Sequence, residues 1–310
     1  MKVAVVGSGV MGPGIAQVFL MGGHRVALTD IKEEALTAGV QEIKNSLELM
    51  VAKGITSQDV SALMDNLQTT TDLAAAVQDA DLVVEAVPEV IEIKKKVYAD
   101  LDRYCKPEAV IVSNTSALPL PDLFPQFRPG RFFVAHFMNP PQIIPLVEIV
   151  KNDRTDPDLV AWLKGELEKC GKKPIVINGF VKGFLINRMQ AAMAREALYL
   201  YEKGIVSLED LDTATIACIG FKSAWQGTFE TMDYIGLDTC AFAYNIIFPD
   251  LCSDTTVPGT IMQKVQEGKL GLKTGEGFFS YPAGAADVSR ERQSGLLEQL
   301  KLFNTYLLKK

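Results

Sequence analysis

A pattern of three glycines near the start of the chain most constrains its fold. Residues 3–16 read VAVVGSGVMGPGIA, with an apolar, strand-like run before the glycines and a helix-like run after them. Glycines at this Gly-x-Gly-x-x-Gly spacing allow a tight turn, close approach of a pyrophosphate to the backbone, and close packing of the helix on the strand. The helix N-terminus then offers free N–H groups to phosphates. The residues expected to contact a dinucleotide here are Gly7, Gly9, Val10, Met11 and Gly12.

An acidic residue ends the second strand-like run, Arg25–Asp30. Asp30 stands 23 residues after Gly7 (30 − 7 = 23), where a carboxylate would accept hydrogen bonds from the adenosine ribose hydroxyls. The same carboxylate would repel a 2′-phosphate, so the sequence predicts NAD rather than NADP. FAD uses the same glycine pattern, but the sequence carries no second flavin feature. A strand–helix turn without a ligand is the remaining alternative.

Strand-like and helix-like runs alternate through the first half of the chain. The strand-like runs are Lys2–Val6, Arg25–Asp30, Leu82–Ala86, Ala109–Ser113, Phe132–Ala135, Leu146–Val150 and Lys173–Asn178. The helix-like runs are Pro13–Met21, Glu33–Lys53, Ser57–Asn66, Val90–Tyr104 and Pro157–Cys170. This alternation predicts a parallel sheet covered by helices on both faces, which is an α/β Rossmann-like domain.

The strand pattern stops near residue 180, and helical spacing of apolar residues replaces it. We therefore expect two domains, a Rossmann-like NAD-binding domain over residues 1–180 and an all-α domain over residues 181–310. Within the second domain, Pro282–Asp287 is predicted to be a linker and Arg290–Leu308 a terminal amphipathic helix.

Composition narrows the classes of partner. The 310-residue chain has a net charge of −7 and a pI near 5.1, which argue against nucleic acid or an anionic membrane as the main partner. Its five cysteines are widely spaced with no C-x-x-C pair, so neither a disulfide framework nor a metal site is predicted. No apolar run approaches the roughly 18 residues of a membrane helix, and the first residues do not resemble a signal peptide. We expect a cytoplasmic protein that acts on a small molecule.

One of the two histidines stands in a segment with a candidate partner acid. His24 precedes the second strand in GGHRV and is expected in a solvated turn. His136 follows a strand-like run, and Glu148 lies 12 residues further on (148 − 136 = 12) among apolar residues. An imidazole suits the task of a base for a hydroxyl proton, and a carboxylate would fix its tautomer. Sequence spacing leaves two alternatives open, a catalytic pair or a core histidine beside a separately satisfied acid.

Several separated motifs, in one order, give the chain a resemblance to a known family. They are VVGSGVMGPGIA, DLVVEAVPEVIEIKKKVY, SNTSAL, HFMNPPQIIPLVE, GFLINR, FETMDYIGLD and KLGLKTGEGFF. Through them, nearly the whole chain resembles the L-3-hydroxyacyl-CoA dehydrogenase family. The resemblance implies a Rossmann-like NAD domain and a helical domain that forms a homodimer. It also implies NAD-dependent oxidation of a short-chain L-3-hydroxyacyl-CoA, such as 3-hydroxybutyryl-CoA, to the 3-oxoacyl-CoA.

The resemblance implies roles for individual residues. His136 matches the catalytic base and Glu148 the acid that pairs with it. Ser116 and Asn187 match the residues that bind the substrate and orient the reacting oxygen. The further cofactor residues that it implies are Glu89, Lys94, Asn114, Ser116 and Lys273. The residues implied to contact CoA are Ser46 and Lys53. Read without the resemblance, Lys94, Ser46 and Lys53 would belong to solvated helix faces.

Three departures from the family pattern bear on the substrate. The chain has Pro140-Pro141 followed by IPLVE, Lys182 in place of the usual proline before GFLINR, and a tail beyond GEGFFSY. The prolines and the tail resemble the lambda-crystallin and L-gulonate 3-dehydrogenase branch, which oxidises a 3-hydroxy acid without CoA. The alternatives are therefore a dehydrogenase of a non-CoA 3-hydroxy acid, of the L-gulonate or carnitine type, or a non-catalytic, crystallin-like structural protein.

Overall fold

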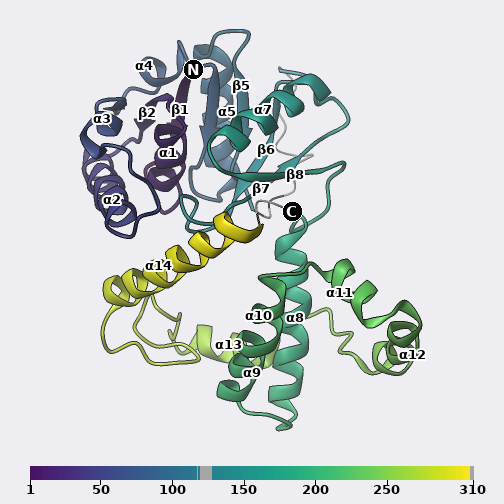
Figure 1. Cartoon of the computed structure of the whole chain (residues 1–310). Helices are drawn as coiled ribbons and strands as arrows, with labels where there is room; N and C mark the ends of the chain where they lie inside the picture. Colours follow the sequence, from purple (N-terminus) through teal and green to yellow (C-terminus); the bar gives the residue numbers. More distant parts are fainter. Residues whose placement is uncertain (117, 119–127, 308–310) are drawn as a thin grey trace. The chain divides into compact units, whose positions relative to one another are not determined.

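The computed structural model describes residues 1–116, 118 and 128–307 (Figure 1). The chain forms two compact units. The first comprises Met1–Arg188 together with Leu296–Lys301, and the second comprises Met189–Gly295 together with the residues from Leu302 onward. The sheet lies in the first unit, whereas the described part of the second unit is helical apart from two isolated β-bridges.

The first unit contains an eight-stranded sheet in the order β3-β2-β1-β4-β5-β6-β7-β8. The strands are β1 (Lys2–Val6), β2 (Arg25–Thr29), β3 (Leu67–Thr70), β4 (Leu82–Glu85), β5 (Val110–Ser113), β6 (Phe132–Phe137), β7 (Leu146–Val150) and β8 (Lys173–Ile177). All neighbouring strands run parallel except β6 and β7. The expected Rossmann-like architecture is confirmed, but the expectation of a wholly parallel sheet is wrong at this pair. The short segment 138–145 turns the chain back without the crossover that a parallel pair needs.

Helices cover both faces of this sheet, as the alternation of elements predicts. They are α1 (Gly12–Met21), α2 (Glu33–Ala52), α3 (Val60–Met64), α4 (Leu73–Val77), α5 (Ile91–Tyr104) and α7 (Pro157–Lys169). One buried cluster joins the sheet to α1, α2 and α7, through side chains such as Phe19, Ile43 and Leu163. A second cluster joins the other face to α4 and α5, through side chains such as Val77 and Leu101. The strands are thus buried on both faces, which explains their nearly continuous apolar sequence.

The second unit consists of helices of which few side chains are buried. They are α8 (Ile186–Glu202, whose first residues belong to the first unit), α9 (Leu208–Ala214), a π-helical turn (Thr215–Gly220), α10 (Phe221–Ser223), α11 (Thr228–Ile235), α12 (Leu237–Ile247), a 3₁₀ turn (Phe248–Asp250) and α13 (Gly259–Gln266). Among the described residues of this unit, the buried side chains are those of Cys240 and Cys252. No described helix of the chain is long and apolar enough to cross a bilayer.

A terminal helix, α14 (Ala285–Leu302), returns to the first unit. It starts inside the segment predicted to be a linker, so the predicted first residue, Arg290, is wrong. Helical structure continues after Leu302 as a π-helical turn (Phe303–Leu307), and the predicted last residue, Leu308, lies outside the described residues. Leu297 is buried against Met50 of α2 and against Ile143. Lys53 Nζ, just after α2, forms an ion pair with Glu298 Oε1 at 3.1 Å. The end of α14 is therefore part of the packing of the NAD-binding unit.

Candidate active site

The three glycines form an open turn at the carboxyl end of β1. Gly7 has a φ of +106°, and a Cβ there would lie 2.7 Å from the carbonyl oxygen of Ala86. A Cβ at Gly12 would lie 1.8 Å from the carbonyl oxygen of Gly7, so a side chain is excluded at both positions. A Cβ at Gly9 would meet nothing within 4 Å. The backbone is thus free of steric obstruction where a pyrophosphate would approach it, beside the start of α1.

Asp30 lies directly beside this turn, at the end of β2. Its Oδ2 accepts a hydrogen bond from Ser8 N at 2.8 Å, and its Oδ1 accepts one from Lys32 N at 3.0 Å. The carboxylate therefore fixes the turn between β1 and α1 from the position predicted for ribose recognition. A carboxylate in this place fits a cofactor with free ribose hydroxyls rather than a 2′-phosphate.

His136 and Glu148 stand opposite each other on β6 and β7. The antiparallel register pairs His136 with Glu148 directly, and His136 Nδ1 lies 2.8 Å from Glu148 Oε2. His136 lies within β6 rather than after a strand, because pairing with β7 extends β6 to Phe137. A cross-strand pair brings two side chains on the same face of the sheet into contact. The fold thus brings together two side chains that are twelve residues apart in the sequence.

The surroundings of Glu148 keep it charged. Burial opposes ionisation of this carboxyl, but the hydrogen bond from His136 and the two backbone donors outweigh it, so its pKa is held below its ordinary value. Those donors are Leu185 N and Ile186 N, each 2.9 Å from Oε1. An ionised carboxylate only accepts hydrogen bonds, so the Nδ1 of His136 must carry the proton. The Nε2 of a neutral imidazole is then left as the atom that can accept a proton.

Ser116 and Asn187 approach each other in this unit. Asn187 Nδ2 donates to the carbonyl oxygen of Ser116 at 3.2 Å. Glu89 Oε1 accepts hydrogen bonds from Ser116 N at 2.6 Å and from Ser116 Oγ at 3.2 Å. Asn114 Oδ1 accepts from Phe137 N at 2.8 Å, which ties the end of β5 to the histidine strand. The predicted residues Glu89, Asn114, Ser116 and Asn187 are therefore connected to one another or to the strand that carries His136.

Lys94 is enclosed by carboxylates instead of lying on a solvated helix face. Its Nζ lies 2.7 Å from Glu85 Oε1 and 3.3 Å from Glu89 Oε2, and its side chain is 1 % exposed. Tyr98 Oη and Ser113 Oγ donate to the other oxygen of Glu85. The expectation from helix periodicity is wrong here because a buried carboxylate at the end of β4 needs a cation beside it.

Three predicted contact residues, Ser46, Lys53 and Lys273, lie outside the group around His136 and Glu89. Ser46 is buried, with Gln142 Nε2 at 3.5 Å from its Oγ, so it does not lie on an exposed helix face. Lys53 is engaged by Glu298. Lys273 lies in the second unit, after α13. Their predicted contacts with CoA or with the cofactor stay predictions.

His24 is buried rather than solvated. Its Nδ1 lies 3.4 Å from the N-terminal amine of Met1, and its Nε2 lies 3.7 Å from Glu166 Oε2. Burial and the positive N-terminus lower the pKa of His24. It lies on the side of the sheet away from the glycine turn, so it takes no part in the site built here.

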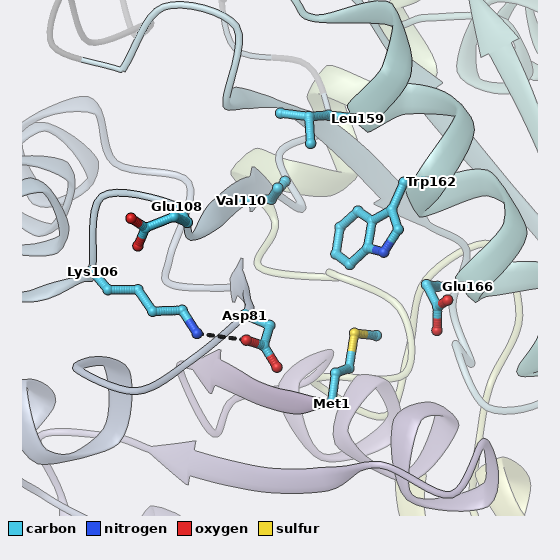
Figure 2. Close-up of a pocket in the computed structure, with 8 residues that line it drawn as sticks. All are labelled: Met1, Asp81, Lys106, Glu108, Val110, Leu159, Trp162 and Glu166. Carbon is cyan, nitrogen blue, oxygen red and sulfur yellow. Dashed lines mark hydrogen bonds and ion pairs between the residues drawn. The ribbon is translucent and has the colours of Figure 1, made fainter.

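A hollow of about 470 Å³ lies near His24, at the amino ends of the parallel strands (Figure 2). The residues that line this hollow are Met1, Asp81, Lys106, Glu108, Val110, Leu159, Trp162 and Glu166. Figure 2 shows the Lys106–Asp81 ion pair between two of these lining side chains. Ligands of open α/β sheets bind at the opposite, carboxyl edge. That edge is where the glycine turn and His136 lie.

A glycine turn and a carboxylate-held histidine at one edge of such a sheet are features of the NAD-dependent oxidoreductases. Sequence comparison narrows this class. Residues 2–180 match the pattern of the 3-hydroxyacyl-CoA dehydrogenase NAD binding domain, and residues 183–281 match that of the 3-hydroxyacyl-CoA dehydrogenase C-terminal domain. The chain belongs to the 3-hydroxyacyl-CoA dehydrogenase family, and its N-terminal part is an NAD-binding domain.

Individual relatives within the family differ in their named substrates. The chain is 34 % identical over 298 residues to the 5-formyl-3-hydroxy-2-methylpyridine 4-carboxylate 5-dehydrogenase of Mesorhizobium japonicum. The alignment covers 96 % of each of the two chains. It is 36 % identical over 283 residues to a probable 3-hydroxybutyryl-CoA dehydrogenase of Deinococcus radiodurans, covering 91 % of this chain and 100 % of the relative. A crystal structure of a 5-formyl-3-hydroxy-2-methylpyridine 4-carboxylic acid 5-dehydrogenase superimposes with a TM-score of 0.91 at 32 % identity, over 98 % of both chains.

Proposed function

We propose that this protein oxidises a hydroxyl group of a small molecule to a carbonyl, reversibly and with NAD, and that His136 is the base. The observation that carries the proposal is the 2.8 Å contact between His136 Nδ1 and Glu148 Oε2 at the carboxyl edge of the sheet. Bound NAD would supply the hydride acceptor. Gly7, Gly9 and Asp30 are the residues that fit its pyrophosphate and ribose.

In the proposed reaction His136 Nε2 takes the proton of the substrate hydroxyl as the carbon gives up its hydride and the carbonyl forms. Glu148 holds the imidazole in the required tautomer and stabilises the imidazolium that results. Ser116 and Asn187 orient the reacting oxygen, since hydroxyl and amide groups form hydrogen bonds without taking up the proton. In the reverse direction His136 returns the proton.

The first candidate substrate is a short-chain L-3-hydroxyacyl-CoA. Family membership supports it, together with relatives such as the probable 3-hydroxybutyryl-CoA dehydrogenase of Deinococcus radiodurans. In this candidate Ser46 and Lys53 would contact CoA. The proposal requires Lys53 to exchange Glu298 for a phosphate, which is feasible because exposed ion pairs are weak.

The second candidate is a compact hydroxy acid without CoA, or an aldehyde acid that adds water and reacts as its hydrate, which carries the hydroxyl that the proposed reaction needs. Two observations favour it. Ser46 is buried, and the face of α2 near Met50 and Lys53 is packed against α14. The family pattern ends at residue 281, before α14, whereas the Mesorhizobium relative, which is named for a pyridine carboxylate, aligns over 96 % of the chain. L-gulonate and carnitine represent the hydroxy acids of this candidate, and the pyridine carboxylate represents its aldehyde acids.

Three wider statements complete the proposal. We place the functional boundary near residue 180, with residues 1–180 carrying the cofactor and residues 181–310 completing the substrate site and forming the contact in a homodimer. The exposed apolar side chains of the helical unit, such as Phe229 and Phe242, support the dimer. We place the protein in the cytoplasm on the basis of its composition.

Reduction of NAD, followed by absorbance with four compounds side by side, tests the function. The compounds are 3-hydroxybutyryl-CoA, L-gulonate, carnitine and 5-formyl-3-hydroxy-2-methylpyridine 4-carboxylate. The first candidate predicts turnover with the thioester alone, and the second predicts turnover with a CoA-free compound. Binding of NAD by calorimetry without turnover of any compound would favour a non-catalytic structural protein.

A further inference from the structure

A buried lysine outside the proposed catalytic pair contacts the turn between the two strands that carry the pair. Lys172 lies between α7 and β8 and is 5 % exposed. Its Nζ donates hydrogen bonds to the carbonyl oxygens of Pro141, at 2.5 Å, and Ile144, at 3.0 Å. Both carbonyls belong to the segment 138–145, which joins β6 to β7. The side chain therefore binds the connection between the histidine strand and the glutamate strand.

The register of β6 against β7 determines whether His136 and Glu148 meet. A slip by one residue would turn one of the two side chains to the other face of the sheet. Two-residue hairpin turns fix register by their own geometry, but this connection has eight residues (146 − 137 − 1 = 8) and contains adjacent prolines. Its shape rests on internal hydrogen bonds from Ile143 N and Ile144 N to Pro140 O and on contacts from outside the turn. Lys173 N donates a hydrogen bond to Pro145 O at the end of the turn. The side chain of Lys172 donates to Pro141 O in the middle of the turn.

The opposite side of the same turn contacts the first cofactor helix. A Cβ at Gly14 of α1 would lie 2.4 Å from Gln142 Oε1 and 2.6 Å from Pro141 Cγ. The turn is therefore wedged between Lys172 and α1. A change in its shape would reach the proposed catalytic pair through β6 and β7.

The amine of Lys172 donates its hydrogen bonds to carbonyl oxygens. In the part of the chain that the structure describes, no carboxylate lies within ion-pair distance of its Nζ, and the turn itself has no titratable side chain. The titratable group that acts on it from α7 is the Cys170 thiol. Burial raises the pKa of Cys170 to about 11, so this thiol is neutral near pH 7. Burial lowers the pKa of Lys172 itself to about 7.

We propose that Lys172 is a positioning residue for the reaction, whose two hydrogen bonds hold the β6–β7 turn in the shape that keeps His136 against Glu148. The inference rests on the reaction proposed above, and it adds a residue that neither touches substrate nor lies in the glycine turn. Its effect on chemistry is indirect, through the distance between the imidazole and the carboxylate.

A matched pair of variants, Lys172→Met and Lys173→Met, tests this role. Lys173 is the exposed neighbour, so its variant controls for loss of a positive charge. The readout is the NMR resonance of the His136 Nδ1 proton, assigned by its absence in His136→Gln. We expect Lys173→Met to keep this resonance and Lys172→Met to lose it or to exchange the proton at least ~10-fold faster. An unchanged resonance in Lys172→Met would overturn the proposal.

The NMR measurement needs no substrate, so it separates this proposal from the proposed reaction. With whichever compound supports turnover, Lys172→Met should lower kcat roughly 10–100-fold, since small misplacements of reacting groups have effects of this size. Affinity for NAD, measured by calorimetry, should change less than about 2-fold, because both hydrogen bonds go to the turn. If Lys172→Met does not fold, Lys172→Arg decides, and loss of the resonance in folded Lys172→Arg would overturn the role of the donor.

Stability against pH provides an independent test. Between pH 7 and the ordinary lysine pKa of 10.5, the unfolded chain binds a proton at Lys172 that the folded chain does not. Folding stability must therefore rise with pH across this window. The midpoint temperature of the wild type relative to Lys172→Met should increase from pH 7 to pH 10. A constant difference would mean that folding does not lower the pKa of Lys172, which would contradict its enclosure between the turn and α7.

Discussion

Two helices, one from each unit, differ in how much of their surface is covered. Nine of the ten residues of α1 are buried, whereas none of the seventeen residues of α8 is buried. α1 packs against the sheet and against α2. α8 carries exposed Met189 and Met193 on a helix with apolar residues at regular spacing. The first unit is thus complete as a packed domain, and the second is not.

We propose that the two units, which differ in burial, also differ in function. The glycine turn, Asp30 and the His136–Glu148 pair all lie in the unit with the closed core. A rigid scaffold keeps reacting groups in place. The helical unit exposes large side chains that a monomer in water rarely exposes together. A second copy of the chain is the partner that we propose for these helices.

Removing a side chain from the terminal helix tests whether α14 belongs to the closed core. Leu297 is 1 % exposed and Leu302 is 60 % exposed. Leu297→Ala should lower the free energy of unfolding by about 2–5 kcal/mol, because it leaves a cavity beside Met50. Leu302→Ala, the matched control, should change it by less than about 1 kcal/mol. If both variants lower the free energy of unfolding equally in denaturant titrations, α14 does not pack in the core of the first unit.

A charge on the uncovered face of α8 tests the proposed dimer. Met193→Glu would bury an unpaired carboxylate in the contact, so the dimer dissociation constant should rise at least ~100-fold. Ala191→Glu adds the same charge at an exposed position two residues from Met193, which lies on the opposite face of the same helix, and serves as the control. Sedimentation or size exclusion over a concentration series gives the result. An unchanged mass for Met193→Glu would place the contact elsewhere.

Replacing Glu148 with a neutral residue tests whether the His136–Glu148 pair of the first unit takes part in the reaction. Glu148→Gln should reduce kcat roughly 10–100-fold, because an amide stabilises an imidazolium less well than a carboxylate does. The lowered pKa of Glu148 means that this carboxylate stabilises the fold above its ordinary pKa and loses this contribution as pH falls through its lowered value. Acid unfolding of Glu148→Gln should therefore be less steep. Identical acid transitions would count against the pairing.

The smallest effect is expected at the ribose position. Asp30→Ala should weaken NAD binding about 10-fold, through loss of charge-assisted hydrogen bonds. Lys32→Ala leaves the carboxylate in place and is the control. Calorimetry with NAD and NADP gives both affinities, and the preference for NAD over NADP should narrow in Asp30→Ala. An unchanged preference would remove Asp30 from cofactor recognition.

Local patterns were enough to predict the first strand, the glycine turn, α1 and the acid that ends β2. Each of these follows from residues close together in sequence. The edge strand β3 carries too few apolar residues to be recognised, since Leu67–Thr70 reads LQTT. The helix α4, LAAAV, is apolar but spans only five residues, which is too short to show a helical period. The structure adds them between the predicted helix near α3 and β4.

Contacts between distant segments could not be predicted from the sequence. The antiparallel register that joins His136 to Glu148 depends on a turn whose shape is held by Lys172. The burial of His24 depends on Glu166 of α7 and on the N-terminus. The burial of Lys94 depends on Glu85, which precedes it by nine residues on another element. In each case a charged or polar residue is buried because a partner reaches it through the fold.

The central claim is that His136 takes the substrate proton in an NAD-dependent oxidation. The most direct test is the rate of NADH formation in a single turnover of His136→Gln at saturating NAD, with the affinity for NAD measured on the same sample. We predict a rate about 1,000-fold below that of the wild type with the NAD affinity nearly unchanged. A rate within a few-fold of the wild type, or a loss of NAD binding that accounts for the slower rate, would contradict the account.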